Sequence, residues 1–396
     1  MKLDTFGRSY LTLTLEIEKH IEGYIDAYTG PDDLKAAVAA TPKREPAALL
    51  DDLAWLQAHI PGDDAARAAY LTAVLRALEC TLHLLRGDEV PYLDEVQRIF
   101  DISPTLVDES QFTAAHHELD TLLPGAGSIA ERLEVRRQRY LLPPEKVLPL
   151  LELAREEARR RTLALFDLPN DNGVEITLTN GQPWSAYNWF KGNGRSHIEF
   201  NTDIPISALS LIGTFAHEGY PGHHSEHLLK EQKFVHELGY GEMAAALLHS
   251  PAAVIAEGIA TTAAEIIFPE GSHHQWTLAV LLPAAGIVTE ETAVHMQRLA
   301  QASEQLRYVG GNAAILYHTG QLNREQAIDY LVTYALSSPE RAAKSFSFFT
   351  HPLFRSYIFT YTQGYDLIAQ AAAAADGDKW PVFRRMLTEQ IRPLQL

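Results

Sequence analysis

The sequence predicts a mainly α-helical fold with a small β-sheet, arranged as two lobes of one integrated unit. Three observations lead to this prediction. Apolar residues recur at helical spacing through about the first 165 of the 396 residues. Two short segments that alternate between apolar and polar residues follow. Helical spacing then returns from Pro205 onward. We therefore expect an N-terminal helical lobe over residues 1–165 and a second lobe over residues 166–396.

The N-terminal lobe is predicted from periodic segments separated by breakers. The segments are Tyr10–Tyr28, Asp51–His59, Asp63–Arg86 and Ile129–Arg161. Gly30-Pro31 and Pro61-Gly62 lie between the first three, and such pairs mark turns. Pro143-Pro144 divides the last segment into two helices, because proline cannot donate the helical hydrogen bond.

The sheet is predicted from Val174–Leu178 and His197–Phe200, where apolar and polar residues alternate. A connection over Asn180–Gly194, rich in Gly, Asn and Trp, joins them. Further helices are expected over Ile206–Tyr220, Pro251–Phe268, Thr289–Tyr308, Asn323–Ala335, Pro339–Phe349, Leu353–Ala375 and Lys379–Arg392.

Composition limits the functions that the chain can have. The net charge of −18 argues against binding to nucleic acid and to anionic membranes. Cys80 is the single cysteine, so an internal disulfide and a cysteine-based metal site are excluded. The first residues lack the basic and apolar regions of a signal peptide, and no apolar run approaches the ~20 residues of a membrane span. We expect a cytoplasmic protein.

The segment His217-Glu218-Gly219-Tyr220-Pro221-Gly222-His223-His224 carries the strongest chemical signal. Zinc prefers imidazole and carboxylate ligands, and a catalytic zinc keeps one position open for water. A common arrangement is His-Glu-x-x-His on a helix, where the glutamate acts as the base. Here the expected second histidine is replaced by Pro221, and the next candidates are His223 and His224.

Helix geometry tests this spacing. In an unbroken helix His224 lies about 20° from the face of His217 but about 10.5 Å along the axis, and His223 is rotated by roughly 120°. Neither could share a zinc ion with His217. A single metal site therefore needs a break at Pro221-Gly222, which these two residue types allow. Either His223 or His224 could then be the second ligand. The alternative is a plain helix end with no metal.

A third ligand is expected from the segment Pro251–Phe268. The segment is apolar nearly all round, which indicates a buried helix. A buried carboxylate needs a metal, a proton or a hydrogen-bonding partner. Glu257 is the predicted ligand, and Glu265, two turns further on, is expected to orient a histidine ligand. The alternative for both is an ion pair with a buried arginine.

These residues resemble the domain-of-unknown-function family 885, a large and mostly bacterial family. Its members carry a His-Glu-x-x-Pro-Gly-His-His motif and then a Glu-Gly-Trp-Ala-type helix that ends in Glu. The corresponding residues here are His217–His224, Glu257-Gly258-Ile259-Ala260 and Glu265. Ile259 replaces the usual aromatic residue, and Glu226 stands where Gln is common. The family is similar to zincin metallopeptidases with a glutamate ligand. The resemblance implies a zincin-like fold for the second lobe and hydrolase activity.

The expected mechanism uses one zinc ion held by His217, His223 and Glu257, with His224 as the alternative second histidine or as a residue supporting the ligands. Glu218 would take a proton from the activated water. Tyr357 and Tyr361, four residues apart on one side of a helix, could donate to the oxyanion, and Arg355 could grip a substrate carboxylate. The strand His197–Asn201 is expected to lie at the sheet edge and pair with an extended substrate.

The resulting hypothesis is a zinc metallopeptidase acting on a peptide. Two alternatives remain open. A zinc amidase on small non-peptide amides would share the same site. A metal-binding protein without turnover would have no use for Glu218, because structural zinc usually has four protein ligands.

Overall fold

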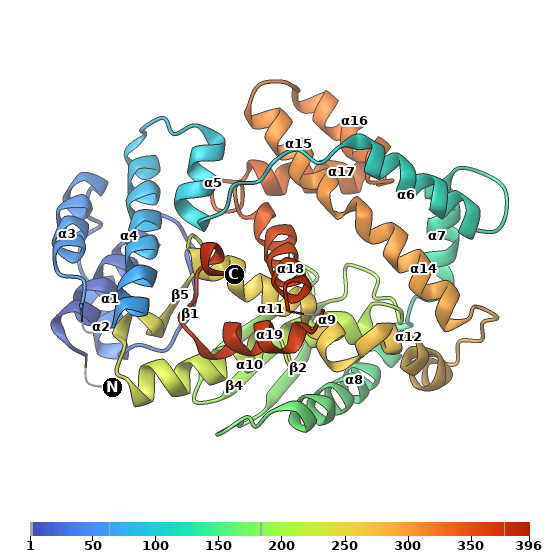
Figure 1. Ribbon diagram of the computed structural model, residues 1–396, viewed down its shortest axis with the longest axis horizontal. Coiled ribbons are helices and arrows are strands. Elements are labelled where there is room, and N and C mark those ends of the chain that lie inside the picture. The colour runs from blue at the N-terminus through green and yellow to red at the C-terminus, as the bar shows by residue number, and fades with distance from the viewer. Residues whose placement is uncertain (1–2, 63, 183, 376) are drawn as a thin grey trace.

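The computed structural model describes residues 3–62, 64–182, 184–375 and 377–396. In this part of the chain the fold is mostly helical, with two small sheets set among the helices (Figure 1). The predicted mainly α fold with a small sheet is therefore confirmed. The division near residue 165 stays a prediction.

Helices form over most of the predicted N-terminal segments, and further helices, α2, α5 and α6, lie outside them. Asp4 caps α1 and Asp64 caps α4 by accepting backbone N–H groups, while Ser128 and Glu131 form a capping box at α7. The bounds are α1 Thr5–Glu18, α2 Asp32–Ala39, α3 Pro46–Ala58, α4 Ala65–Arg86, α5 Tyr92–Phe100, α6 Glu109–Leu122, α7 Ile129–Arg139 and α8 Pro144–Leu165.

One predicted helix is too long. The segment Tyr10–Tyr28 is helical only to Glu18 and ends in the strand β1 (Ile25–Tyr28). This strand pairs antiparallel with β5 (Ala245–Leu247), more than 200 residues further along the chain. Local periodicity could not indicate β1, because its hydrogen-bonding partner is so distant in the sequence.

The larger sheet has three strands in the order β2-β4-β3. The two predicted strands are present as β2 (Val174–Thr179) and β4 (Arg195–Asn201), which pair in parallel. The predicted connection contains the additional strand β3 (Ala186–Gly192), antiparallel to β4. Asn193 and Gly194 both have positive φ, as a tight hairpin turn requires. The central position of β4 makes the predicted edge role of His197–Asn201 wrong, because both its sides are already paired.

The remaining helices cover most of the C-terminal half, with short 3₁₀ and π-helical turns between several of them. Helix α18 begins five residues later than predicted. The bounds are α9 Leu211–Glu218, α10 His223–Lys230, α11 Pro251–Ile267, α12 Ser272–Trp276, α13 Leu282–Ala285, α14 Ala293–Glu304, α15 Val309–His318, α16 Arg324–Tyr334, α17 Pro339–Thr350, α18 Ile358–Ala373 and α19 Lys379–Thr388.

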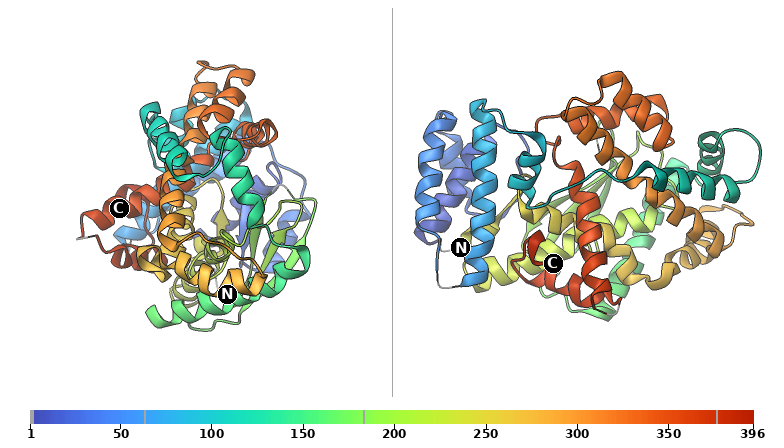
Figure 2. Two further views of the ribbon diagram at one scale, coloured as in Figure 1. Left: turned by 90° about the vertical axis from the view of Figure 1, so that its right-hand side faces the viewer. Right: turned by 45° about the horizontal axis from the view of Figure 1, so that its top comes forward.

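Helix α11 lies at the centre of the molecule, between α9 and α18 (Figures 1 and 2). Its residues reach three hydrophobic clusters: Ala263 packs with the sheet and α9, Val254 with α5 and α15, and Ile259 with α19. A fourth cluster joins α1, α3 and α4 to β5. The segment was predicted to be a buried helix that is apolar nearly all round, and most of its residues are buried.

A buried ion pair ties α4 to the turn that precedes β5. Arg67 makes a bidentate contact with Glu242 at 2.7 and 2.8 Å, and both side chains are buried. We predict that Arg67→Met lowers the free energy of unfolding by about 3–5 kcal/mol, because it leaves Glu242 buried without its cation. Arg298→Met, which breaks an exposed pair with Glu118, should cost less than ~1 kcal/mol. Urea unfolding measures both values, and equal costs would contradict the prediction.

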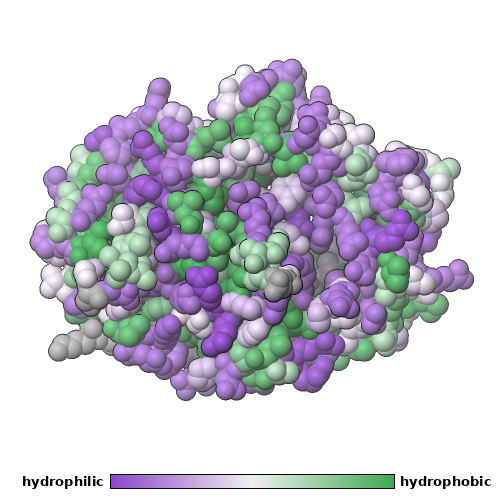
Figure 3. Space-filling model, viewed as in Figure 1, coloured by the Kyte–Doolittle hydropathy of each residue, from purple (hydrophilic) through white to green (hydrophobic). Residues whose placement is uncertain are grey.

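Helix α4 is long and apolar enough to cross a membrane by length and composition alone, and so is the bent pair Pro251–Ile267 and Pro269–Ala285 if it counts as one span. This is weak evidence, because 56% of the α4 window is buried inside the fold, as in the core helix of a globular protein. Figure 3 shows hydrophilic residues over most of one face of the molecule, with hydrophobic residues in patches between them.

Candidate metal centre

The chain breaks between the two halves of the histidine motif. Helix α9 ends at Glu218, and α10 begins at His223. The Tyr220-Pro221 peptide bond is cis. A Cβ atom at Gly222 would overlap with the carbonyl oxygens of Ala216 and His217, so only glycine fits there. The predicted interruption of the helix at Pro221-Gly222 is confirmed.

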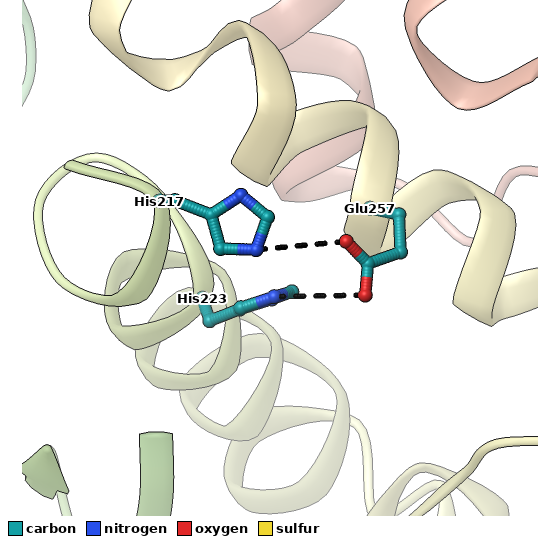
Figure 4. Close-up of side chains that lie close together, drawn as sticks. All are labelled: His217, His223 and Glu257. Carbon is teal, nitrogen blue, oxygen red and sulfur yellow. Dashed lines mark ion pairs between the residues drawn. The ribbon is translucent and has the colours of Figure 1, made fainter. Parts of the chain in front are cut away.

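The break brings His217, His223 and Glu257 together (Figure 4). Nε2 of His217 lies 3.6 Å from Oε2 of Glu257, and Nε2 of His223 lies 4.0 Å from Oε1. One ligand atom from each of the three residues lies within 4.8 Å of the others. Glu257 reaches this point from α11, as Figure 4 shows. The structure therefore selects His223 as the second histidine of the cluster.

These three residues fit a zinc ion. Ligand atoms at 2.0–2.1 Å from a tetrahedral zinc lie about 3.3 Å apart, so the two observed N···O separations of 3.6 and 4.0 Å need to shorten by about 0.3 and 0.7 Å. Oε2 of Glu257 is buried and has no hydrogen-bond partner. A buried carboxylate oxygen without a partner is costly unless a cation faces it. Two imidazoles and one carboxylate form a common donor set of catalytic zinc sites.

The charges at the cluster also favour a bound cation. Burial alone opposes a charged His223, but Glu226, Glu257 and Glu218 outweigh it and raise the pKa of His223 to about 10. In the absence of a metal, these carboxylates therefore hold a proton on the imidazole. Burial, with His223 adding to it, lowers the pKa of His217 to about 3, so that ring is neutral and free to bind a metal.

Glu218 lies beside the cluster, with Oε1 at 3.9 Å from Nε2 of His217. Burial raises the pKa of Glu218 to about 7, and nearby carboxylates add to this while His223 opposes it. A carboxylate whose pKa lies close to neutrality suits proton transfer. Asn188 on β3 donates its side-chain N–H to the backbone oxygen of Glu218 and so fixes the end of α9 against the sheet.

Two further residues hold the ligands in place. Tyr357 donates its hydroxyl to Oε1 of Glu257 at 2.7 Å. Glu226 faces Nδ1 of His223 at 3.8 Å and is paired with Lys230. This contact between Glu226 and His223 was not predicted from the sequence. The available signal was the position of Glu226 three residues after His223, on the same helix face.

We predict that Tyr357→Phe weakens zinc binding by about 10- to 100-fold, the usual cost of removing a hydrogen bond that orients a metal ligand. Competition with a chromogenic chelator measures this change. Tyr361→Phe is the matched control, because Tyr361 has no hydrogen bond to Glu257 among the described contacts. Equal affinities for the wild type and Tyr357→Phe would contradict the assigned role.

His224 does not reach the cluster. Its side chain is fully buried, with Nδ1 at 2.8 Å from Ser196 Oγ and Nε2 at 3.1 Å from Asp171. Asp171 also accepts hydrogen bonds from Tyr220 and Arg159. His224 therefore fastens the start of α10 to β4 and to the loop before β2. Its predicted role as alternative ligand does not agree with this geometry, while a supporting role does.

Glu265 and Arg355 also differ from their predicted roles. Glu265 pairs with Lys379 of α19, and among the described contacts it makes no hydrogen bond or ion pair with His217 or His223. Arg355 lies in the turn before α18, where its guanidinium pairs with the buried Glu95 at 3.2 Å. It is not among the residues that line the cavity described below. A buried carboxylate needs such a cation, which explains why Arg355 is held away from the cluster.

The cluster opens into a cavity of about 1680 Å³. Residues from both predicted lobes line it, including β1, β3, α11 and α18. Tyr357 and Tyr361 both face this cavity, as their spacing predicted, with ring centroids 5.7 Å apart. The edge strand β3 contributes a continuous wall from Ala186 to Phe190.

Comparison with known structures supports the fold. The chain is similar to a solved structure described as "the putative lipoprotein from Colwellia psychrerythraea", with a TM-score of 0.51 and 14% sequence identity. The likeness covers 88% of this chain but only 64% of the other, so the chain spans less than two thirds of that protein. No protein-family model and no curated protein matches the chain. Identity at this level shows a shared fold alone.

Proposed function

We propose that the chain is a zinc-dependent hydrolase, and specifically a metallopeptidase that uses Glu218 as its general base. The observation that carries the proposal is the convergence of His217, His223 and Glu257 beside Glu218 at the wall of a large cavity. A purely structural zinc usually has four protein ligands and needs no adjacent base. Three ligands leave room for water and substrate.

Each residue of the site then has a defined role in hydrolysis. His217, His223 and Glu257 would hold the zinc ion, which would supply Lewis acidity and lower the pKa of water at the cavity wall. Glu218 accepts a proton from the attacking water and later delivers it to the leaving amine. Tyr361 lines the same cavity as Glu218, and its hydroxyl would donate to the developing oxyanion. Tyr357 keeps Glu257 in place rather than touching the substrate.

The fold proposal follows from the same residues. We assign the region around α9, α10 and α11 to a zincin-like fold and the chain to the domain-of-unknown-function family 885, on the basis of the motif His217–His224 and Glu257. We assign the pairing with an extended substrate, first expected of β4, to β3, because β3 is the edge strand that lines the cavity. An extended peptide along β3 would place its carbonyl groups near the metal ligands.

The test is a digest of a mixed peptide library by protein depleted of metal and then loaded with zinc. Zinc-loaded protein should cleave peptides, and the metal-free protein should not. Mass spectrometry of the products identifies the cleaved bonds. Stoichiometric zinc without cleavage of any peptide would overturn the peptidase proposal and favour a zinc amidase on non-peptide amides. Absence of bound zinc would overturn the metal site itself.

A further inference from the structure

Asp26 is an acidic residue at the cavity that the proposed mechanism does not use. It lies on β1, lines the cavity, and is partly exposed. The hydroxyl of Tyr187 on β3 donates to Oδ1 of Asp26, which fixes the carboxylate against the sheet edge. No Lys, Arg or His nitrogen of the described residues lies within ion-pairing distance of it.

Asp26 is also close to the reacting groups. Its negative charge adds to the effect of burial in raising the pKa of Glu218, of Glu257 and of Tyr361. The geometry agrees: Asp26 and Glu218 line the same cavity, and Tyr187, which holds Asp26, is next to Asn188, which donates to the backbone oxygen of Glu218. Burial lowers the pKa of His227, although Glu226 and Asp26 oppose this effect, so His227 supplies no clear positive charge for Asp26.

The charges of the site leave Asp26 without a counterion. Two positive charges on zinc would balance Glu257 and Glu218, and Lys230 balances Glu226. One negative charge, on Asp26, remains beside the place where the scissile bond would lie. A carboxylate in a partly dry cavity is stabilised most by a cation that arrives with the ligand.

We propose that Asp26 binds the free α-ammonium group of the substrate, which makes the chain an aminopeptidase acting on short peptides. This inference rests on the proposed function. The closeness of Asp26 to Glu218 favours an α-ammonium group over a lysine side chain, because the α-nitrogen is only two bonds from the carbonyl carbon of the first residue. A lysine ammonium stands at the end of a four-carbon stem.

The test measures binding and therefore does not depend on turnover. Isothermal titration calorimetry compares trialanine with N-acetyl-trialanine on zinc-loaded Glu218→Gln protein. We expect the free amine to bind about 10- to 100-fold more tightly, the usual effect of a partly buried charge pair. The ratio of the two affinities, free amine over N-acetylated peptide, should fall close to one in the double variant Glu218→Gln/Asp26→Asn. Asparagine at position 26 keeps an acceptor for Tyr187.

Two matched variants make the result specific. Glu22→Gln neutralises another carboxylate that lines the cavity and should leave the ratio unchanged. Tyr187→Phe keeps the charge of Asp26 but removes its hydrogen bond, and should reduce the ratio only by about threefold. Circular dichroism checks that each variant is folded. If Glu22→Gln lowered the ratio as much as Asp26→Asn, a general charge effect would replace the proposed site.

The possible outcomes separate this inference from the proposed function. Equal affinity for the two peptides, or a ratio that survives Asp26→Asn, overturns the inference even if the zinc-loaded protein cleaves peptides. A ratio that depends on Asp26 supports the binding of the α-ammonium group by Asp26 even if the library digest fails, and the failed digest would then count against the proposed function. Tight binding of N-acetyl-lysyl-dialanine that also depends on Asp26 would overturn the α-ammonium assignment in favour of a side-chain ammonium.

Discussion

Replacing Glu218 with Gln is expected to lower kcat by about 10²- to 10⁴-fold while zinc stays bound, since this is the usual contribution of a positioned general base. The amide has nearly the same shape as the carboxylate, but it cannot accept the proton of the attacking water. Glu218 is not one of the three clustered ligands, so the donor set remains complete. Steady-state hydrolysis of a peptide from the library measures the loss, and elemental analysis measures the zinc.

The matched control is Glu22→Gln, which neutralises a carboxylate of the same cavity at a distance from the cluster. It should retain kcat within about threefold, as expected for a surface charge. If Glu218→Gln kept kcat within the same range as this control, Glu218 would not be the general base. If Glu218→Gln also lost its zinc, the residue would have to be reassigned as a ligand.

The second large effect is a contrast between two adjacent histidines. His223→Ala is expected to weaken zinc binding by about 10²- to 10³-fold, because structural zinc sites gain ~10–16 kcal/mol from about four ligands. His224→Ala should instead lower the free energy of unfolding by about 2–4 kcal/mol. It removes a fully buried ring and leaves the hydrogen-bonding groups of Ser196 and Asp171 without this partner.

Zinc titration and urea unfolding of both variants give four values. The expected pattern is low affinity for His223→Ala, and low stability with nearly normal affinity for His224→Ala at a temperature where it is folded. Metal-free His223→Ala should also lose some stability, because it lacks the charged imidazole that faces Glu226 and Glu257. The opposite pattern would show that the structure assigns the two histidines the wrong way round. Equal losses of affinity would require a ligand set larger than three.

Much of the cluster could be predicted from the sequence because its signals are local. His217 and Glu218 are adjacent, and the break at Pro221-Gly222 follows from helix geometry and from the two residues themselves. Glu257 stands out because a carboxylate in an apolar helix needs a partner. The choice between His223 and His224 could not be made in this way. It depends on Asp171 and Ser196, which come from other parts of the chain.

The errors share one physical cause. The strand β1 needs its partner β5, Glu265 takes its role from Lys379, and Arg355 is held by Glu95. Each of these contacts joins segments more than 100 residues apart, so they could not be predicted from local periodicity. The strand β3 was missed for another reason. Its buried position 188 is an asparagine and its exposed position 189 is a tryptophan, so burial alternates along the strand while hydrophobicity does not.

The most direct test of the central claim is a crystal structure of zinc-loaded protein, with anomalous diffraction data collected at the zinc absorption edge. The account predicts one strong anomalous peak within about 2.0–2.3 Å of Nε2 of His217, Nε2 of His223 and a carboxylate oxygen of Glu257. The carboxylate of Glu218 should face the open side of that peak without binding it. A peak elsewhere in the molecule, a peak bound by His224, or no peak at stoichiometric zinc would contradict the account.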